Sequence, residues 1–257
     1  MRERAQAEPV ARVSAETVPT AHYEGGLPVA PPRALEVVPA QTRRTVSRDE
    51  SRSKPGKDLA LASKRAIDII GASFGLLILS PLFAITSLMI VVVNGRPVLF
   101  VQPRAGLEGK PFRIFKFRTM SRDADAMRDD LRSQNEVAGG ASFKMSADPR
   151  ITRFGRVLRR TSIDELPQLV NVLRGEMSLV GPRPHPFDDV AGYQPWHHGR
   201  FAMKPGVTGL WQVAGRGDSD FDRWVELDLE YIREWSLALD LRILARTLPA
   251  VLRGSGR

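Results

Sequence analysis

Residues 69–93 read IIGASFGLLILSPLFAITSLMIVVV, a run of 25 residues without a single charge. At about 1.5 Å per residue, a helix of this length is long enough to cross the apolar part of a bilayer. Ser80 and Pro81 lie near its middle, and a proline inside a helix removes one backbone hydrogen bond. The run predicts a membrane helix broken at Ser80-Pro81, where the serine can satisfy the backbone group that the proline frees.

The charges beside this run bear on how it enters the membrane. Lys64 and Arg65 precede it, and Arg96 and Arg104 follow it, whereas a spanning helix usually carries its positive charge mainly at the cytoplasmic end. Positive charge at both ends favours a re-entrant helix, placed at residues 59–96, that returns to the face from which it entered. A spanning helix and a buried core helix are the alternatives that the residues alone leave open.

The composition of the rest excludes several classes of protein. Residues 1–58 are rich in Pro, Ala, Glu, Arg and Ser and lack a hydrophobic period, which is typical of a disordered polar tail. The chain of 257 residues contains no cysteine, which excludes disulfide scaffolds, cysteine-built zinc sites, Fe–S clusters and thiol catalysis. Its four histidines lack the spacing of a histidine-built metal site.

The positive charge is concentrated in one part of the chain. The formal net charge is +9, and residues 96–160 alone hold 15 basic and 7 acidic residues, a net charge of +8. Such a stretch suits either an anionic surface, such as nucleic acid or a phospholipid leaflet, or a polyphosphate substrate.

Short strands and helices are predicted after the apolar run. Residues 98–101 and 112–117 read as two strands joined by a turn rich in Pro and Gly, and alternation along the second places Lys116 and Arg118 on one face. That face carries either a binding site or solvated side chains. Residues 121–137 predict a charged helix, and residues 151–160 predict a basic amphipathic helix that includes Arg159.

Two adjacent acids stand in the stretch TSIDELPQLVNVLRGEMS, residues 161–178. Ser162 and Glu165 have the spacing of a capping box, which would place Asp164 and Glu165 in the first turn of a helix. One acid could attack or act as a base while the other holds a hard cation such as Mg²⁺. The alternative is an ordinary helix start that favours acids near its positive end.

Three later segments are less specific. The loop SLVGPRPHP, residues 178–186, presents Arg183 between two prolines, which suits bidentate contact with phosphate. The segment KPGVTGLWQVAGR, residues 204–216, contains glycines that allow close approach to a ligand and ends at Arg216. The loop histidines are expected to be solvated, and the aromatic residues of the amphipathic stretch 220–252 lie either in the core or at a bilayer interface.

Four blocks of sequence together resemble one family. They are KRAIDIIGA, FVQPRAGLEGKPFRIFKFRTM, DPRITRFGRVLRRTSIDELPQLVNVLRGEMSLVGPRP and KPGVTGLWQVAGR. In this order they resemble the bacterial sugar transferases, the monotopic phosphoglycosyl transferases that begin polysaccharide assembly. The resemblance covers residues 64–252. Within the family the chain resembles the short members, with the polar tail 1–58 in place of the N-terminal membrane region of longer members.

The resemblance implies a fold and a reaction. The fold would be α+β and mostly helical, a monotopic membrane-associated domain with a re-entrant helix, a small β-hairpin and amphipathic surface helices. Residues 97–257 would form a catalytic domain on the cytoplasmic face of the bacterial inner membrane. The enzyme would transfer a sugar 1-phosphate, with glucose or galactose as the expected sugar, from a UDP-sugar to undecaprenyl phosphate, releasing UMP in the first step of exopolysaccharide synthesis.

The resemblance also assigns roles to residues. Asp164 matches the nucleophile that forms a covalent phosphosugar intermediate, and Glu165 matches the residue that binds Mg²⁺. Five basic residues match positions that contact phosphate or nucleotide: Lys116, Arg118, Arg159, Arg183 and Arg216. The expected partners are the UDP-sugar, undecaprenyl phosphate and inner-membrane lipids, with no nucleic acid, and a homodimer is left open.

Two other classes of function were weighed. A membrane-anchored nucleic-acid binder would explain the same basic stretch, but no helix-turn-helix or RNP pattern is visible. A non-catalytic scaffold would keep the fold, but the intact pair of Asp164 and Glu165 argues against it.

Overall fold

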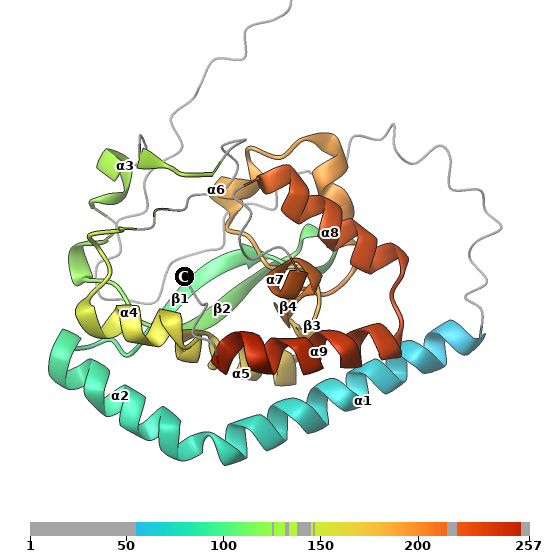
Figure 1. Ribbon diagram of the computed structural model, residues 1–257, viewed down its shortest axis with the longest axis horizontal. Coiled ribbons are helices and arrows are strands. Elements are labelled where there is room, and N and C mark those ends of the chain that lie inside the picture. Colours follow the sequence, from blue (N-terminus) through green and yellow to red (C-terminus); the bar gives the residue numbers. More distant parts are fainter. Residues whose placement is uncertain are drawn as a thin grey trace, which may run out of the picture. The chain divides into compact units, whose positions relative to one another are not determined.

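The computed structural model describes residues 55–124, 126–131, 134–137, 145, 147–214 and 220–252 (Figure 1). Residues 1–54 of the predicted tail, and Arg216, lie outside the described residues. The elements are mostly helices, with one β-hairpin and one short parallel strand pair. The predicted α+β class with a small hairpin is therefore confirmed.

Helices α1 (Pro55–Ile78) and α2 (Ser80–Asn94) contain the uncharged run and are bent by 60° at the break between them. Pro81 lies in the first turn of α2, where its missing N–H would have no helical partner in any case. The Ser80 hydroxyl donates to the Leu77 carbonyl at 2.8 Å. That carbonyl lies four residues before Pro81, so the predicted break and the role of the serine are confirmed.

The bent pair presents a large apolar surface. No described helix is by itself long and apolar enough to cross a membrane, but α1 and α2 together reach that length and composition. The other described elements lie on the inner side of the bend (Figure 1). Exposed apolar side chains of the pair include Ile70, Phe74, Leu77, Ile85, Leu88 and Val92.

The predicted hairpin is present and longer than expected. Strands β1 (Leu99–Ala105) and β2 (Pro111–Phe117) pair antiparallel, with Leu99 opposite Phe117 and Ala105 opposite Pro111. A short turn, η2 (Leu107–Gly109), connects them. One face of β2 enters a core cluster that also includes residues of α1 and of the following helix α5 (Gln168–Arg174).

The segment after the hairpin differs from the prediction. Among the described residues of 121–137, the 3₁₀ turn η3 (Arg122–Ala124) and the short helix α3 (Arg128–Leu131) are separated by non-helical residues, so the prediction of a single helix was wrong. The segment lacks the apolar stripe that would hold a longer helix against the core. The basic helix is confirmed as α4 (Arg153–Arg160), capped by the Thr152 hydroxyl, which accepts from the Gly155 N–H at 2.9 Å.

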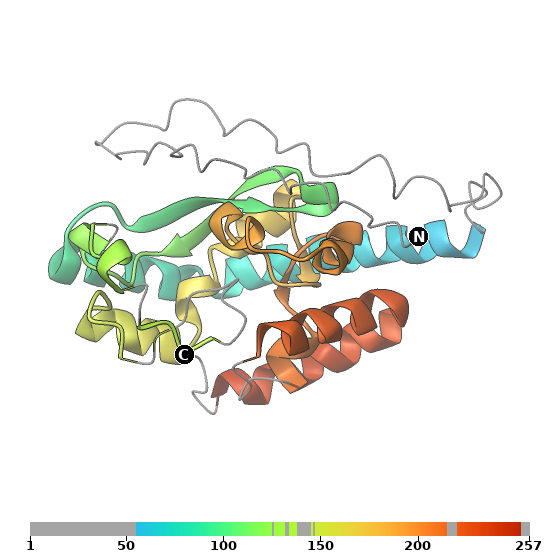
Figure 2. The ribbon, with the colours of Figure 1, turned by 90° about the horizontal axis from the view of Figure 1, so that it is seen from above.

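The second half of the chain alternates short strands with helices. After the 3₁₀ turn η5 (Ile163–Glu165) and α5, strand β3 (Ser178–Val180) pairs in parallel with β4 (Gly206–Thr208). The other elements are α6 (Phe187–Val190), η6 (Pro195–Ala202), α7 (Leu210–Ala214), α8 (Phe221–Arg233) and α9 (Leu237–Leu252). Seen from above, the hairpin lies on one side of the described elements, and α8 and α9 lie on the opposite side (Figure 2).

Gly206, in the predicted ligand loop, lies against another backbone segment. A Cβ atom on Gly206 would lie 2.1 Å from the backbone nitrogen of Gly181, closer than real Cβ contacts. The glycine therefore allows two backbone segments to touch. The structure also decides between the two alternatives for the aromatic residues of α8. Phe221, Trp224 and Tyr231 are buried in the core and do not lie at a bilayer interface.

Candidate active site

The two adjacent acids lie on the short 3₁₀ turn η5, between α4 and α5. Ser162 has a left-handed backbone conformation, with φ of 57°, and its side chain makes no capping hydrogen bond. The predicted capping box is therefore wrong, and α5 begins only after Pro167. The sharp turn buries Asp164, of which 8% of the surface is exposed, whereas Glu165 is partly buried.

Glu165 is held by two cations from distant parts of the chain. Lys116 Nζ, on strand β2, lies 2.9 Å from Glu165 Oε1. Arg183, in the loop after β3, donates to Oε1 at 2.8 Å and to Oε2 at 3.4 Å. Burial opposes ionisation of Glu165, but the charges of Arg183 and Lys116 outweigh it and hold the pKa of this carboxyl well below its ordinary value. Glu165 is therefore an anion throughout the neutral range.

Asp164 has the opposite electrostatic character. Burial, and secondly the negative charge of Glu165, raise its pKa to about 6, against the opposing charges of Lys116, Arg159 and Arg183. Neighbouring carboxyls with separated pKa values are typical of sites where the two groups have different roles. At pH 7 to 8 Asp164 is a buried carboxylate with higher basicity than an exposed aspartate.

Asn171 joins the helix after the acids to the strand that carries Lys116. Its Oδ1 accepts from the Phe115 N–H at 3.0 Å, and its Nδ2 donates to the Arg113 carbonyl at 2.6 Å and to Glu176 at 2.7 Å. Asn171 was not among the residues predicted from the sequence to form the site. The feature that could have indicated it is a single polar side chain within the apolar run LVNVL, residues 169–173.

Replacement of Asn171 by leucine is expected to destabilise the protein by about 1–3 kcal/mol, because it leaves the partly buried Phe115 N–H and Arg113 carbonyl without their partner. Chemical denaturation measures this loss. The matched variant Leu173→Ala, in the same helix, removes apolar contact but no hydrogen bond. An Asn171→Leu variant with wild-type stability would contradict the assigned role.

The loop that presents Arg183 is supported by a second buried ion pair. Arg200, in η6, pairs with Asp228 of α8, and both side chains are almost fully buried. Arg200 also donates to the Arg183 carbonyl at 3.3 Å and to the Tyr193 hydroxyl at 2.7 Å. Neither Arg200 nor Asp228 was identified from the sequence, since no motif marks two charges 28 residues apart.

The predicted basic residues divide into three groups. Lys116 and Arg183 contact Glu165 directly. The Arg159 Nε donates to the Thr119 hydroxyl at 2.9 Å, and its charge lowers the pKa of Asp164. Arg118, in contrast, donates to the backbone carbonyls of residues 94, 95 and 96, after the end of α2. Of the four predicted cations that the structure describes, three thus lie near the acids and Arg118 lies at the end of α2.

A family model described as bacterial sugar transferase matches residues 59–254.

The chain belongs to the bacterial sugar transferase family.

Relatives of this sugar transferase have curated names. The chain is 47% identical over 197 residues to the galactosyl transferase CpsE of Streptococcus agalactiae. The match covers 76% of this chain and 43% of CpsE. The chain is 40% identical over 197 residues to the exopolysaccharide production protein ExoY of Rhizobium meliloti, across 76% of this chain and 87% of ExoY. The third is the UDP-glucose:undecaprenyl-phosphate glucose-1-phosphate transferase of Escherichia coli, 42% identical over 193 residues, across 72% of this chain and 39% of that protein.

The coverage differs between these relatives. The matched part of the sugar transferase spans less than half of CpsE and of the E. coli protein but most of ExoY. The family predicted from the four sequence blocks is therefore confirmed, and its shorter relatives are those that the chain matches along most of their length.

The histidines of the sugar transferase differ from the prediction. His185 and His197 are buried among aromatic rings, so the expectation that they are solvated was wrong. Burial, together with the positive charges of Arg200 and Arg104, holds the pKa of His185 well below its usual value. His185 lies in the loop before α6 and His197 lies in η6, and the spacing of neither residue indicates burial.

The acids of the sugar transferase provide the oxygen atoms that a hard cation needs. Among the described residues no group of three or more His, Cys, Asp or Glu side chains could hold a metal. Mg²⁺ is commonly held by one or two carboxylates together with substrate phosphates. The two carboxylates lie close enough for Glu165 to raise the pKa of Asp164, so the donor set fits such a cation.

Proposed function

We propose that this sugar transferase moves a hexose 1-phosphate, with glucose or galactose as the hexose, from a UDP-hexose to undecaprenyl phosphate and releases UMP. The observation that carries the proposal is the buried Asp164 beside Glu165, with Lys116, Arg159 and Arg183 around them. The names of two relatives add galactosyl transfer for CpsE, and glucose 1-phosphate transfer and undecaprenyl phosphate for the E. coli protein. The product would begin exopolysaccharide synthesis, in which ExoY is named.

The first half of the reaction uses Asp164 as nucleophile. A carboxylate oxygen attacks the β-phosphorus of the UDP-hexose, and the bond from that phosphorus to the bridging oxygen breaks. UMP leaves with the bridging oxygen and the electron pair, and the hexose phosphate remains on Asp164. Burial supports this role because it leaves the carboxylate with little solvation to lose.

The second half releases the aspartate. A phosphate oxygen of undecaprenyl phosphate attacks the same phosphorus, and the bond to Asp164 breaks. This gives undecaprenyl-diphosphate-hexose and the free carboxylate. Two separate displacements suit a water-soluble donor and a lipid acceptor, since the two substrates need not occupy the site together.

The cations and Glu165 would handle the negative charge. Arg183 presents a planar guanidinium that suits bidentate contact with phosphate, and Lys116 adds a point charge beside it. We propose that Glu165 contributes to a Mg²⁺ site with the donor diphosphate and that Arg159 and Arg216 contact the phosphates or the nucleotide of the donor. Mg²⁺ would supply neutralisation of the diphosphate charge.

The proposed setting is the cytoplasmic face of the bacterial inner membrane. Family membership supports membrane association, and the bent pair of α1 and α2 has the length and composition of a re-entrant segment. Both ends of such a segment lie on one face. The exposed side chains of α4, Val157 among three arginines, would suit an anionic leaflet.

The test is UMP release by the purified full chain in native lipid, with undecaprenyl phosphate, Mg²⁺ and a panel of UDP-sugars. We expect release with UDP-glucose or UDP-galactose. Without the acceptor, intact-protein mass spectrometry is expected to detect one hexose phosphate adduct, mapped to Asp164. Folded protein that releases no UMP from any UDP-sugar would argue against the proposal.

The acid side of the pH profile should report Asp164. Because attack needs the carboxylate, and its pKa is raised to about 6, kcat/KM for the UDP-hexose is expected to fall about tenfold per pH unit below 6. Above pH 7 the group is ionised and this limb is flat. Initial rates between pH 5 and 8 measure it, and a constant kcat/KM across that range would contradict Asp164 as the attacking group.

A further inference from the structure

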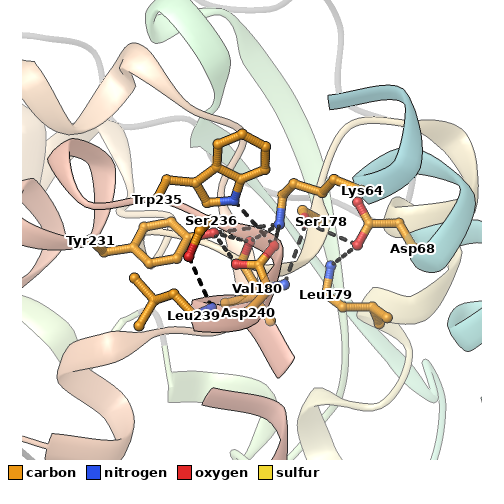
Figure 3. Close-up of polar contacts among 10 residues, drawn as sticks. All are labelled: Lys64, Asp68, Ser178, Leu179, Val180, Tyr231, Trp235, Ser236, Leu239 and Asp240. Atoms are coloured by element: carbon orange, nitrogen blue, oxygen red, sulfur yellow. Dashed lines mark hydrogen bonds and ion pairs between the residues drawn. The ribbon is translucent and has the colours of Figure 1, made fainter. Parts of the chain in front are cut away.

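A buried polar cluster joins helix α1 to strand β3 and helix α9 (Figure 3). The Lys64 ammonium group donates to Asp240 Oδ2 at 2.7 Å and to the Val180 carbonyl at 2.9 Å. The Tyr231 hydroxyl oxygen lies 2.7 Å from the other oxygen of Asp240 and 3.1 Å from the same Val180 carbonyl, so its single hydrogen can be donated to either. Lys64, Asp240 and Tyr231 are all buried. The charge of Lys64 therefore meets the protein interior and not lipid head groups.

Asp68, one turn further along α1, extends this contact. Its Oδ1 accepts from the Ser178 hydroxyl at 2.9 Å and from the Leu179 N–H at 2.8 Å (Figure 3). Lys64 and Asp68 together bond to all three residues of β3, from Ser178 to Val180. Polar contacts of this kind fix the register of a helix that apolar packing alone would allow to slide or rotate.

Arg65, the next residue of α1, bonds to a different segment. Its two terminal nitrogens donate to the carbonyls of Val172 and Leu173, at 2.6 and 2.9 Å. Both carbonyls belong to the last turn of α5. A guanidinium at this end of a helix also complements the helix dipole.

These two segments carry the two partners of the active-site ion pair. Helix α5 begins three residues after Glu165, and Val180 precedes Arg183 by three residues. The residues between Val180 and Arg183 have little freedom: the Gly181 N–H donates to residue 208, and the Pro182 carbonyl accepts from residue 206, both at 2.9 Å. A displacement of β3 or α5 therefore changes the geometry of the pair.

We propose that Lys64 and Arg65 are positioning residues, which seat the Arg183 loop and the Glu165 turn on one turn of the membrane helix α1. The proposal rests on the proposed function, since it assigns Glu165 and Arg183 to the phosphotransfer site. It makes the geometry of the ion pair depend on the seating of α1. Two residues that look like flanking positive charges of an apolar run thus act inside the protein.

The variant Arg65→Lys distinguishes a positioning residue, which holds two carbonyls of α5, from a residue that only supplies positive charge beside the apolar run. Lysine keeps the charge, but a single ammonium group cannot reproduce the fork of the guanidinium on two carbonyls. We expect kcat for UMP release to fall about 10- to 100-fold, with a Tm within about 3 °C of wild type. Wild-type kcat in Arg65→Lys would overturn the role of Arg65.

Lys64 is tested with both charges of its ion pair removed, because Lys64→Met alone leaves Asp240 buried without its cation. The double variant Lys64→Met/Asp240→Asn is neutral and keeps an oxygen for the Tyr231 hydroxyl. We expect a Tm near wild type but kcat at least about tenfold lower. The matched control is Lys110→Met, which removes a lysine from an exposed pair with Glu108 and should leave kcat unchanged.

Hydrogen exchange gives a readout that does not depend on activity. In the double variant the amides of residues 178–183 are expected to exchange about tenfold faster than in wild type, while amides of α8 are unchanged. Wild-type exchange and wild-type kcat in the folded double variant would overturn the proposal. If wild-type protein releases no UMP, the proposed function fails, and exchange alone then decides whether Lys64 holds the loop.

Discussion

Asp164→Asn is expected to reduce UMP release by at least about 10³-fold and at the same time to stabilise the protein. The activity is lost because the amide is not a nucleophile, and removal of an attacking side chain leaves only the residual effect of binding. The covalent hexose phosphate adduct should also disappear. UMP release and intact mass, measured on the same preparation, check both statements.

The gain in stability follows from the pKa of Asp164. It is raised from 3.8 to about 6, so the folded state favours the protonated group, and the charged form costs free energy above pH 6. At 1.36 kcal/mol per pKa unit, the neutral amide should raise the free energy of unfolding at pH 8 by about 2–3 kcal/mol. The gain should shrink as the pH falls through 6 and vanish below about pH 3.8.

Glu165→Gln is the matched control, because its pKa is shifted in the opposite direction. The charges of Lys116 and Arg183 favour the anion, so loss of the charge should destabilise the protein at pH 8. If both variants change stability in the same direction, the separation of the two carboxyl pKa values is wrong.

Arg200→Met is expected to destabilise the protein by about 3–5 kcal/mol, because it leaves the Asp228 carboxylate buried without its cation. The pKa of Asp228 is raised to about 6 even beside Arg200, chiefly by burial. The group can therefore take up a proton once its partner is lost. The loss of stability should be smaller at pH 5 than at pH 8, and urea denaturation at the two pH values measures it.

The double variant Arg200→Met/Asp228→Leu tests whether this loss comes from the unpaired charge. Apolar replacement of both partners of a buried ion pair is often close to neutral for stability, so most of the loss should be recovered. Activity should stay low, because Arg200 also donates to the Arg183 carbonyl. A double variant as unstable as Arg200→Met would show that the loss has another origin.

The elements that could be predicted from sequence are those that local physics determines. The break at Ser80-Pro81 follows from a missing N–H and a nearby hydroxyl, and the hairpin and α4 follow from side-chain periodicity. The helix predicted at residues 121–137 failed because charge alone does not hold a helix. The capping box failed because Ser162 takes a left-handed conformation, which spacing does not reveal.

The candidate site was predicted in part. Asp164, Glu165, Lys116 and Arg183 were found because the four blocks match a family, and the structure brings them together. Asn171, Arg200 and Asp228 were missed, since their roles depend on partners distant in sequence: Asp228 lies 28 residues from Arg200, and Arg113 lies 58 residues from Asn171. Arg118 donates to three backbone carbonyls, a contact that the alternation of side chains along the strand did not indicate.

The ion pair between Lys64 and Asp240 also has a consequence for the order of events during synthesis. Its partners are 176 residues apart, and at a bacterial translation rate of about 5–20 residues per second the second one follows the first by about 9 to 35 s. The apolar helix pair leaves the ribosome long before its interior contacts exist. In the proposed membrane setting, the lipid bilayer would therefore receive α1 and α2 first, and the later part of the chain would close onto a helix pair already in place.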